Sequence, residues 1–256
     1  HLGILTGNGV RWSLSHSARK LYESGTLSRY TADFVLGDLS RLDAVLQTGE
    51  PVKGPDGVSR VSEGGVREDD IAGTRAFMEM LYRRSGDSAQ EVGRWIQGLV
   101  APGGHVLDVG GGHGRYGQNL IDRGYQVTLF DRPICCQLAE ERHGDIMRYL
   151  SGDFMTDALG GPYHGCLLSN IVHGLGPEEN IQLLRRLGEA TGDRGYVVIK
   201  DMFVDDLRAH PEEAVVFALT MLMYTRQGRT YSFGEMQDML SQSGFGPIQQ
   251  VYVPDM

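Results

Sequence analysis

The sequence predicts a doubly wound α/β fold, in which a parallel sheet carries helices on both faces, preceded by an α-rich segment. Three observations lead to this prediction. From residue 102 onward, apolar runs of strand length alternate with stretches of helical spacing. The first of these runs, "HVLDV" at residues 105–109, continues into the glycine-rich turn "GGGHG". Before residue 102 this alternation is absent and helical spacing dominates.

The front part is expected to begin with two short strands around "GNG" at residues 7–9, because apolar and polar residues alternate on both sides of this tight-turn motif. Further on, helical stretches are separated by a segment rich in Gly and Pro. In order, we expect a helix from near Ser15 or Ser17, a helix over 28–46, a loop over 47–68, and a helical stretch from Asp70 to Leu99 with a break near Gly86.

The α/β part is expected to alternate strands and helices almost to the end of the chain. Its predicted strands cover residues 105–109, 126–131, 147–150, 165–171, 195–203 and the last segment "PIQQVYV" (247–253). Its predicted helices cover residues 115–123, 134–142, 177–190, 211–225 and 233–243. Ligands of open parallel sheets bind beyond the carboxyl ends of the strands, so the residues that follow each strand are candidates for a site.

Composition narrows the classes of partner. A chain of 256 residues with 41% hydrophobic content can bury one large core, and its net charge of −9 argues against nucleic acid or an anionic membrane as the main partner. No apolar run reaches the roughly 18 residues of a membrane span, and we expect no secretion because no charged-then-apolar leader pattern is seen. The sparse cysteines, Cys135, Cys136 and Cys166, predict reduced thiols and a cytoplasmic protein. Because the chain begins with His1, we expect further residues upstream.

The glycine-rich turn fits two different nucleotide-binding patterns. Residues 112–117 satisfy G-x-G-x-x-G, which is typical of dinucleotide binding, and residues 108–114 satisfy D-x-G-x-G-x-G, which is typical of a methyl donor. In both cases glycines allow positive φ and let the ligand approach the backbone, and a helix starting near Arg115 presents its N-terminus. The turn alone leaves both ligands open.

Residues further along discriminate between the two. Asp131 ends the second strand and could accept ribose hydroxyl protons from either ligand. Asp108 suits an ammonium or sulfonium cation and would repel a pyrophosphate, and Asp153 with Phe154 follows the third strand, where a carboxylate and an aromatic face could meet adenine. These three residues favour the methyl donor. Asp108 could instead be a turn or helix-capping carboxylate, and Phe154 could belong to the core.

Four ordered blocks carry a resemblance to a known family: "VLDVGGGHGRYGQNL", "VTLFDRP", "GDFMTDALGGPYHGCLLSNIVHGLGPEENIQLLRRL" and "GYVVIKDMF". Together they resemble the S-adenosylmethionine-dependent small-molecule O-methyltransferases of the plant caffeate and bacterial antibiotic-tailoring kind. The resemblance covers residues 75–256 well and the front part loosely. It implies a partial winged-helix dimerisation segment over 1–85 and a Rossmann-like S-adenosylmethionine-binding methyltransferase domain over 86–256.

The resemblance also implies the cofactor and its site. S-adenosylmethionine would be the methyl donor and S-adenosylhomocysteine the product. Gly110, Gly112 and Gly114 would line the loop, Asp131 would hold the ribose, and Asp153 and Phe154 would meet the adenine. The full set of expected cofactor-binding residues is Asp108, Gly110, Gly112, Gly114, Asp131, Arg132, Asp153, Phe154 and Asn170.

The resemblance places the catalytic base at His173, just past the fourth strand. A phenol has a pKa of about 10, so a nearby imidazole accelerates its methylation, typically by ~10²–10⁴-fold. Asp201 matches the acid that orients the imidazole in this family. The usual His-Asp-Trp triplet is His173-Gly174-Leu175 here, and the usual second acid is replaced by Gly228. His173 could instead be a strand-end histidine bound to backbone.

The acceptor is expected to be a small aromatic or polycyclic molecule. Phe77, Met80, Met221 and Tyr224 lie where the family closes over its substrate, and thioethers adapt to a flat apolar molecule. At helical spacing, the same residues could be core. No His and Cys spacing suits a metal, so we expect none. The family also implies a homodimer, further helices upstream and one more strand after "VYVPDM".

Three functions remain open. The leading one is O-methylation in secondary metabolism with His173 as general base. The second is methylation of carbon, or a methyltransferase-like protein with altered chemistry, which the changed triplet permits. The third is a non-catalytic DNA-binding regulator, against which the acidic balance argues.

Overall fold

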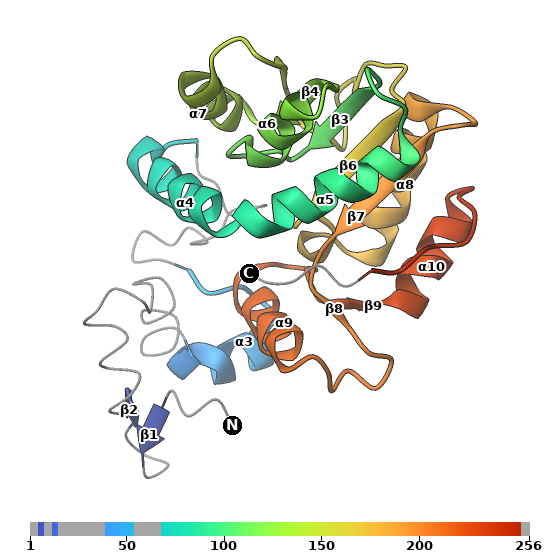
Figure 1. Ribbon diagram of the computed structural model, residues 1–256. Coiled ribbons are helices and arrows are strands. Elements are labelled where there is room, and N and C mark those ends of the chain that lie inside the picture. Colours follow the sequence, from blue (N-terminus) through green and yellow to red (C-terminus); the bar gives the residue numbers. More distant parts are fainter. Residues whose placement is uncertain (1–4, 8–11, 15–38, 54–67, 252–256) are drawn as a thin grey trace. The chain divides into compact units, whose positions relative to one another are not determined.

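The computed structural model describes residues 5–7, 12–14, 39–53 and 68–251 (Figure 1). The chain divides into two compact units: residues 1–60 with 222–226, and residues 61–221 with 227–256. The second unit begins at Val61, so it already includes the helical stretch that starts at Asp70, before the predicted domain boundary at residue 85. The functional boundary expected at residue 85 stays a prediction.

The first unit holds a short hairpin. Strand β1 (Leu5–Gly7) pairs antiparallel with β2 (Trp12–Leu14), which confirms the two predicted strands. Most of the predicted tight turn lies outside the described residues. The helix predicted from Ser15 or Ser17 lies wholly outside them.

The first unit also holds one short helix. The 3-10 turn η2 (Leu39–Arg41) leads into α3 (Leu42–Thr48), which ends at Gly49 with a φ of 68°. The helix predicted over 28–46 is therefore confirmed for the part that the structure describes, and it extends two residues further. The predicted loop that follows lies largely outside the described residues.

The second unit is built on a five-stranded parallel sheet with the order β5-β4-β3-β6-β7 (Figure 1). Its strands are β3 (His105–Val109), β4 (Gln126–Asp131), β5 (Arg148–Ser151), β6 (Gly165–Ser169) and β7 (Tyr196–Lys200). The chain starts in the centre at β3, moves to one edge, and then crosses to the other side through β6. This reversal confirms the doubly wound fold and places the ligand crevice at the carboxyl end of β3.

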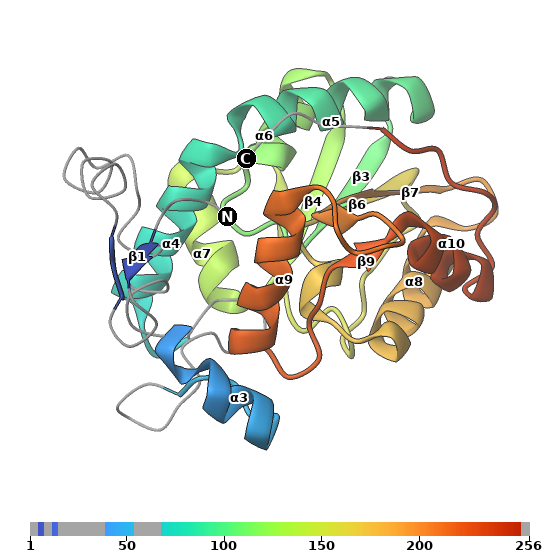
Figure 2. The same cartoon turned by 90° about the horizontal axis from the view of Figure 1, so that it is seen from below.

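Helices cover both faces of this sheet, as predicted. The helices after residue 70 are, in order, α4 (Ile71–Arg84), α5 (Gly86–Leu99), α6 (Arg115–Asp122), α7 (Pro133–His143), α8 (Pro177–Thr191), α9 (Glu212–Tyr224) and α10 (Phe233–Gln242). Of these, α5, α6 and α7 pack on one face of the sheet, and α8 and α10 pack on the other. Figure 2 shows α5 and α6 on one side of the strands and α8 on the other. The break at Gly86 is confirmed, and the predicted helices after residue 110 match within one residue at each end.

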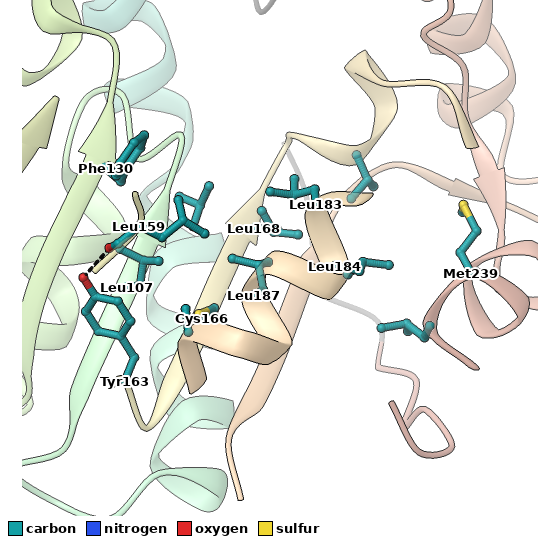
Figure 3. Close-up of a cluster of buried hydrophobic side chains, with 14 of the residues drawn as sticks. Leu107, Phe130, Leu159, Tyr163, Cys166, Leu168, Leu183, Leu184, Leu187 and Met239 are labelled. Carbon is teal, nitrogen blue, oxygen red and sulfur yellow. Dashed lines mark hydrogen bonds between the residues drawn. The ribbon is translucent and has the colours of Figure 1, made fainter. Parts of the chain in front are cut away.

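Two apolar cores result, one on each face of the sheet. On the first face, Ile96 of α5 and Leu120 of α6 pack with Val106, Leu129 and Leu167 of the strands. The second core joins the sheet residues Leu107, Phe130 and Leu168 to α8 through Leu183, Leu184 and Leu187, and to α10 through Met239 (Figure 3). Successive strand residues alternate between these two faces, so core membership tells which way each neighbouring polar side chain points.

Three strand predictions need correction. The strand predicted over 165–171 ends at Ser169, because Asn170 has a positive φ of 59°. The run predicted over 195–203 is interrupted after Lys200, and β8 (Phe203–Val204) pairs instead with β9 (Tyr231–Ser232) in a separate small sheet. The last predicted strand is wrong over residues 247–251, where no strand forms. The proline at 247 has no N–H, and the Ile248 N–H donates to the Gln237 side chain of α10 at 2.8 Å instead of to a strand.

The described residues contain no helix that combines the length and the apolarity needed to span a membrane. Cys135, Cys136 and Cys166 are free thiols inside the second unit, and burial raises the pKa of Cys136 and of Cys166 to about 12. These thiols therefore remain protonated at neutral pH and act as small apolar side chains.

Candidate active site

The glycine loop follows β3 and leads into α6. Gly110, Gly112 and Gly114 all have positive φ, at 65°, 49° and 72°. At Gly110 a side chain would also collide with its surroundings, because a Cβ placed there would lie 2.2 Å from Ile171 Cδ1. The sequence pattern therefore marks positions that the backbone conformation reserves for glycine.

Asp108 lies within β3 and is fully buried, with 0% of its surface exposed. Among the described residues, neither of its carboxylate oxygens has a hydrogen-bond partner. Burial, assisted by the charge of Asp131, raises the pKa of Asp108 to about 7, and the nearby Gly117 backbone N–H opposes part of that rise. A buried carboxyl group without a partner is costly, so this position indicates a ligand that carries a cation.

Asp131 ends β4 and faces the glycine loop. Its Oδ2 accepts a hydrogen bond from the Gly112 N–H at 2.8 Å, and its Oδ1 accepts one from the Arg132 N–H at 2.7 Å. Burial raises the pKa of Asp131, while these two backbone donors oppose the rise. Asp131 is thus held at the carboxyl end of its strand, where the crevice opens. Arg132 itself is half-buried.

Two predicted adenine contacts follow β5 and differ in environment. The Phe154 ring lies 4.0 Å from a Cβ placed at Gly110, so it borders the glycine loop. Asp153 is exposed, and its carboxylate accepts a hydrogen bond from the Met155 N–H at 2.8 Å. The structure brings Phe154 to the loop and leaves Asp153 at the surface nearby.

His173 lies on the 3-10 turn η3 (Val172–Gly174), directly after β6. Its Nδ1 is 2.6 Å from Asp201 Oδ1, and its backbone N–H donates to Asp201 Oδ2 at 3.3 Å. The Asp201 side chain is 1% exposed and the His173 side chain 16% exposed. The ring of Phe217, on α9, meets the imidazole edge-on with 4.8 Å between centroids.

The surroundings keep Asp201 ionised. Burial alone would raise the pKa of Asp201, but His173, the Met202 N–H and the charge of Lys200 together lower it below its usual value. An ionised Asp201 accepts a hydrogen bond from the Nδ1–H of His173, which leaves Nε2 as the ring nitrogen that can accept a proton. This geometry suits a general base and its orienting acid.

Asn170 lies between the glycine loop and this pair. Its φ is 59°, which is unusual for a residue other than glycine and which ends β6. Its N–H donates to the Lys200 carbonyl at 2.8 Å, and its Oδ1 accepts from Lys200 Nζ at 3.0 Å. Asn170 is therefore fixed at the carboxyl edge of the sheet, where its predicted role places it.

The residues predicted to contact the acceptor are not all brought together. Met221 is buried on α9, one turn after Phe217, and residues four apart share a helix face. Phe77 packs against the apolar cluster around Met78 and α7, and Met80 is half-buried on the same helix α4. Tyr224 belongs to the first unit.

Sequence reasoning missed two groups of residues. The first group is Phe217, whose ring contacts His173, and Met78, whose Sδ lies 3.2 Å from a Cβ placed at Gly112. Apolar residues of a helix give no sequence signal that distinguishes a site residue from a core residue. Lys200 and Ser169 end β7 and β6 opposite each other. A lysine before a predicted acid would ordinarily be placed at the surface, whereas Lys200 is only 8% exposed.

A cavity of about 370 Å³ lies between α4 and α7 and reaches the glycine loop only at His113. Its charged side chains already form pairs, Arg75 with Glu141 at 2.7 Å and Arg142 with Glu79. Among the described residues, no group of three or more His, Cys, Asp or Glu side chains is arranged to hold a metal ion.

We expect the affinity for an S-adenosyl ligand to rise as pH increases from 5.5 to 7.5. Asp108 has a pKa of about 7 in the free protein, and a bound cation favours its ionised form, so binding releases a proton. Below pH 7 the dissociation constant should grow by up to about tenfold per pH unit. Calorimetric titration across this range measures the slope.

The Asp108→Asn variant is the matched control, and its affinity should not change over the same range. His113 does not contribute, because burial and neighbouring cations lower its pKa to about 3. A pH slope that persists in the Asn variant would assign the proton to another group, such as Asp131.

Comparisons with known proteins point to one family. A family profile described as the O-methyltransferase domain matches residues 62–246. Over 233 residues the chain is 29% identical to 3-hydroxy-5-methyl-1-naphthoate 3-O-methyltransferase of Streptomyces sahachiroi. This alignment covers 88% of this chain and 64% of that protein. The chain spans less than two thirds of the length of the curated relatives it matches.

Solved structures share the fold. Human N-acetylserotonin methyltransferase, solved with S-adenosylmethionine, has a TM-score of 0.71 at 18% identity and covers 97% of this chain and 75% of its own. The O-methyltransferase NcsB1 of neocarzinostatin biosynthesis was solved with S-adenosylmethionine and 2-hydroxy-5-methyl naphthoic acid. It has a TM-score of 0.68 at 21% identity, covering 95% of this chain and 75% of its own.

Proposed function

Because this chain belongs to the O-methyltransferase domain family, which its residues 62–246 match, we propose that it transfers a methyl group from S-adenosylmethionine to a hydroxyl group of a small aromatic or polycyclic molecule. The observation that carries the proposal is the His173–Asp201 pair, which lies at the same sheet edge as the glycine loop. The same edge of the sheet therefore offers a group that can accept a proton and a loop suited to the nucleoside of a methyl donor. The alternative of altered chemistry rests only on the changed triplet His173-Gly174-Leu175 and the acid replaced by Gly228.

The residues present fit the proposed donor. S-adenosylmethionine supplies a methyl group on a positively charged sulfur when bound. Asp108 offers a buried carboxylate that no side chain among the described residues compensates, the glycine loop gives backbone approach, and Asp131 offers acceptors for ribose hydroxyls. The human relative that shares the fold was solved with this donor, which supports the assignment.

His173 would act as the general base of the reaction. With Nδ1 bound to Asp201, Nε2 would take the proton from the acceptor hydroxyl when that oxygen is methylated, and the donor would leave as its neutral thioether. The ionised Asp201 stabilises the imidazolium that results. Asp201 and Phe217 fix the ring from two sides, so neither the missing Asp-Trp of the family triplet nor the acid replaced by Gly228 is needed to orient it.

The acceptor would lie beyond His173, against α9. Met221 is on the same face of α9 as Phe217, which supports its predicted role. The roles of Phe77, Met80 and Tyr224 stay predictions. The relative from Streptomyces sahachiroi is named for a hydroxynaphthoate acceptor, which supports a fused aromatic hydroxy compound here.

The wider assignments rest on the family resemblance. They are an intertwined homodimer, a winged-helix dimerisation segment over residues 1–85, a cytoplasmic location and a place in secondary metabolism. Asp153, Arg132 and Asn170 complete the proposed donor site, and their positions around the crevice are compatible with it.

Titration of the protein with S-adenosylhomocysteine and, separately, with NAD tests the proposal. We expect heat from the thioether product and none from NAD. Transfer of a labelled methyl group to a hydroxynaphthoate then tests the reaction. Binding of NAD in place of S-adenosylhomocysteine would overturn the donor assignment, and donor binding without transfer to any hydroxyl acceptor would favour the alternative chemistry.

A further inference from the structure

The residues that follow β5 form one hydrogen-bonded turn. The Asp153 carbonyl accepts the N–H group of Thr156 at 3.1 Å and that of Asp157 at 2.8 Å. The turn carries Phe154, which packs against the core shared with α8. Asp153 and Phe154 are the two residues assigned above to the adenine of the donor, so we call residues 153–157 the adenine turn.

The two acids of the adenine turn fix its internal shape. Asp153 Oδ1 accepts the Met155 N–H at 2.8 Å, and Asp157 Oδ2 accepts the Asp153 N–H at 2.9 Å. A Cβ placed at Gly152 would lie 2.7 Å from Asp157 Oδ2, so the glycine leaves the room that this second contact needs. The turn is therefore a defined unit, and its place in the molecule depends on what it is attached to.

Arg186 of α8 attaches the adenine turn to the rest of the unit. Its Nε donates to the Phe154 carbonyl at 3.1 Å, and its Nη2 donates to the Asp157 carbonyl. The last carbonyl groups of a helical turn have no partner within the turn, and an arginine side chain can bind them. Because the guanidinium group is planar and rigid, two bonds from it also fix the orientation of the turn.

The helix that carries Arg186 is itself fixed by the core. Leu183, Leu184 and Leu187 of α8 are 0% exposed and pack against the sheet (Figure 3). Arg186 directly precedes Leu187, so the core sets the position from which its side chain reaches the turn. Interiors are closely packed and deform little, which makes α8 a firm support.

The same helix also contacts the turn that carries the proposed base. Asn180 of α8 is fully buried, and its Nδ2 donates at 3.0 Å to the carbonyl of Val172, the residue before His173. One helix therefore holds the adenine turn through Arg186 and the His173 turn through Asn180. Its length separates the two parts of the proposed site by a fixed amount.

We propose that Arg186 is a positioning residue for adenine recognition. Its two bonds to backbone carbonyls hold the adenine turn where the Asp153 carboxylate and the Phe154 ring can meet the base. The inference rests on the proposed function, because it requires an S-adenosyl donor. Asp153 is exposed and Phe154 is half-buried, so burial does not hold them in place as it holds the leucines of α8.

A comparison of two ligands tests the proposal. The first is S-adenosylhomocysteine, and the second is its analogue with unsubstituted purine in place of adenine, which lacks the 6-amino group. The wild-type protein should bind the first about 10-fold more tightly, because the amino group donates to the charged Asp153 carboxylate. In Arg186→Met the ratio of the two dissociation constants should fall to about 3 or less, since the turn loses this attachment.

The conservative variant and a neighbouring arginine provide the controls. Arg186→Lys keeps a donor that can reach one of the two carbonyls, so its ratio should lie between those of the wild-type protein and Arg186→Met. Arg185, next along α8, binds the carbonyl of Gln242 in α10 at 3.1 Å and does not serve the adenine turn. Arg185→Met should therefore keep the wild-type ratio. Melting temperatures control for folding, and Arg186→Gln replaces Arg186→Met if that variant does not fold.

The ratio distinguishes positioning from general stabilisation, because a purely structural role would weaken both ligands equally. An unchanged ratio in the Arg186 variants, an equal fall in Arg185→Met, or a wild-type protein that binds both ligands alike would overturn the inference. Failure of the wild-type protein to bind S-adenosylhomocysteine at all is a separate outcome, and it would overturn the proposed function.

Discussion

The His173→Ala variant should lose methyl transfer by ~10²–10⁴-fold in kcat while it binds S-adenosylhomocysteine as the wild-type protein does. The imidazole is the group placed to take the proton, since Nδ1 is bound to Asp201 and Nε2 is the other ring nitrogen. The side chain is 16% exposed and contacts Phe217 at its edge, so its removal leaves the core intact. Single-turnover kinetics and calorimetry measure the two quantities.

Asp201→Asn is the companion variant for this prediction. It keeps the shape of the acid and removes the charge that holds the proton on Nδ1, so kcat should fall again with donor affinity unchanged. If His173→Ala retained wild-type turnover, the proton would have to leave by another route, and the histidine would be a structural residue at the end of its strand.

The second large effect is expected at the glycine loop. Gly110→Val should lower methyl transfer by about 100-fold and weaken donor binding, because a misplacement of about 1 Å in a catalytic constellation can cost that much. A side chain at Gly110 would collide with Ile171, two residues before His173, and would border Phe154. The substitution therefore disturbs the donor loop and the base at once.

The Gly124→Val variant is the control that separates the effect of this collision from the effect of backbone strain. Gly124 also has positive φ, at 85°, but a Cβ placed there meets nothing within 4 Å. It should lose about 1–2 kcal/mol of unfolding free energy and keep its affinity for S-adenosylhomocysteine. Equal loss of donor binding in both variants would mean that the loop is sensitive only through overall stability.

Much of the fold could be predicted because its local signals agree. The strands at 105–109 and 126–131 match to the residue, since each is a short apolar run bounded by glycine or by an acid. The final strand could not be predicted, because pairing depends on a neighbour and not on apolar content. The Ile248 N–H bonds to Gln237, and that contact has no signature in the sequence.

The site was predictable to the extent that it lies on the strand ends. Asp131, His173 and the glycines are marked by their place after apolar runs, and the structure brings them to one edge. Phe217 could not be found this way, because after its first two residues α9 is apolar except at Thr220, and periodicity does not single out one face. Lys200 was missed because lysine is rarely buried.

The attachments of His173 come from later parts of the chain. Asp201 binds its ring, Phe217 packs against its edge, and the Arg229 N–H donates to its carbonyl at 2.8 Å. The loop and acids proposed for the donor all precede residue 172. A single genetic crossover near residue 200 would therefore keep the inherited nucleotide pocket and exchange the part of the acceptor wall that α9 supplies, so lineages could diversify their products without re-evolving the donor site.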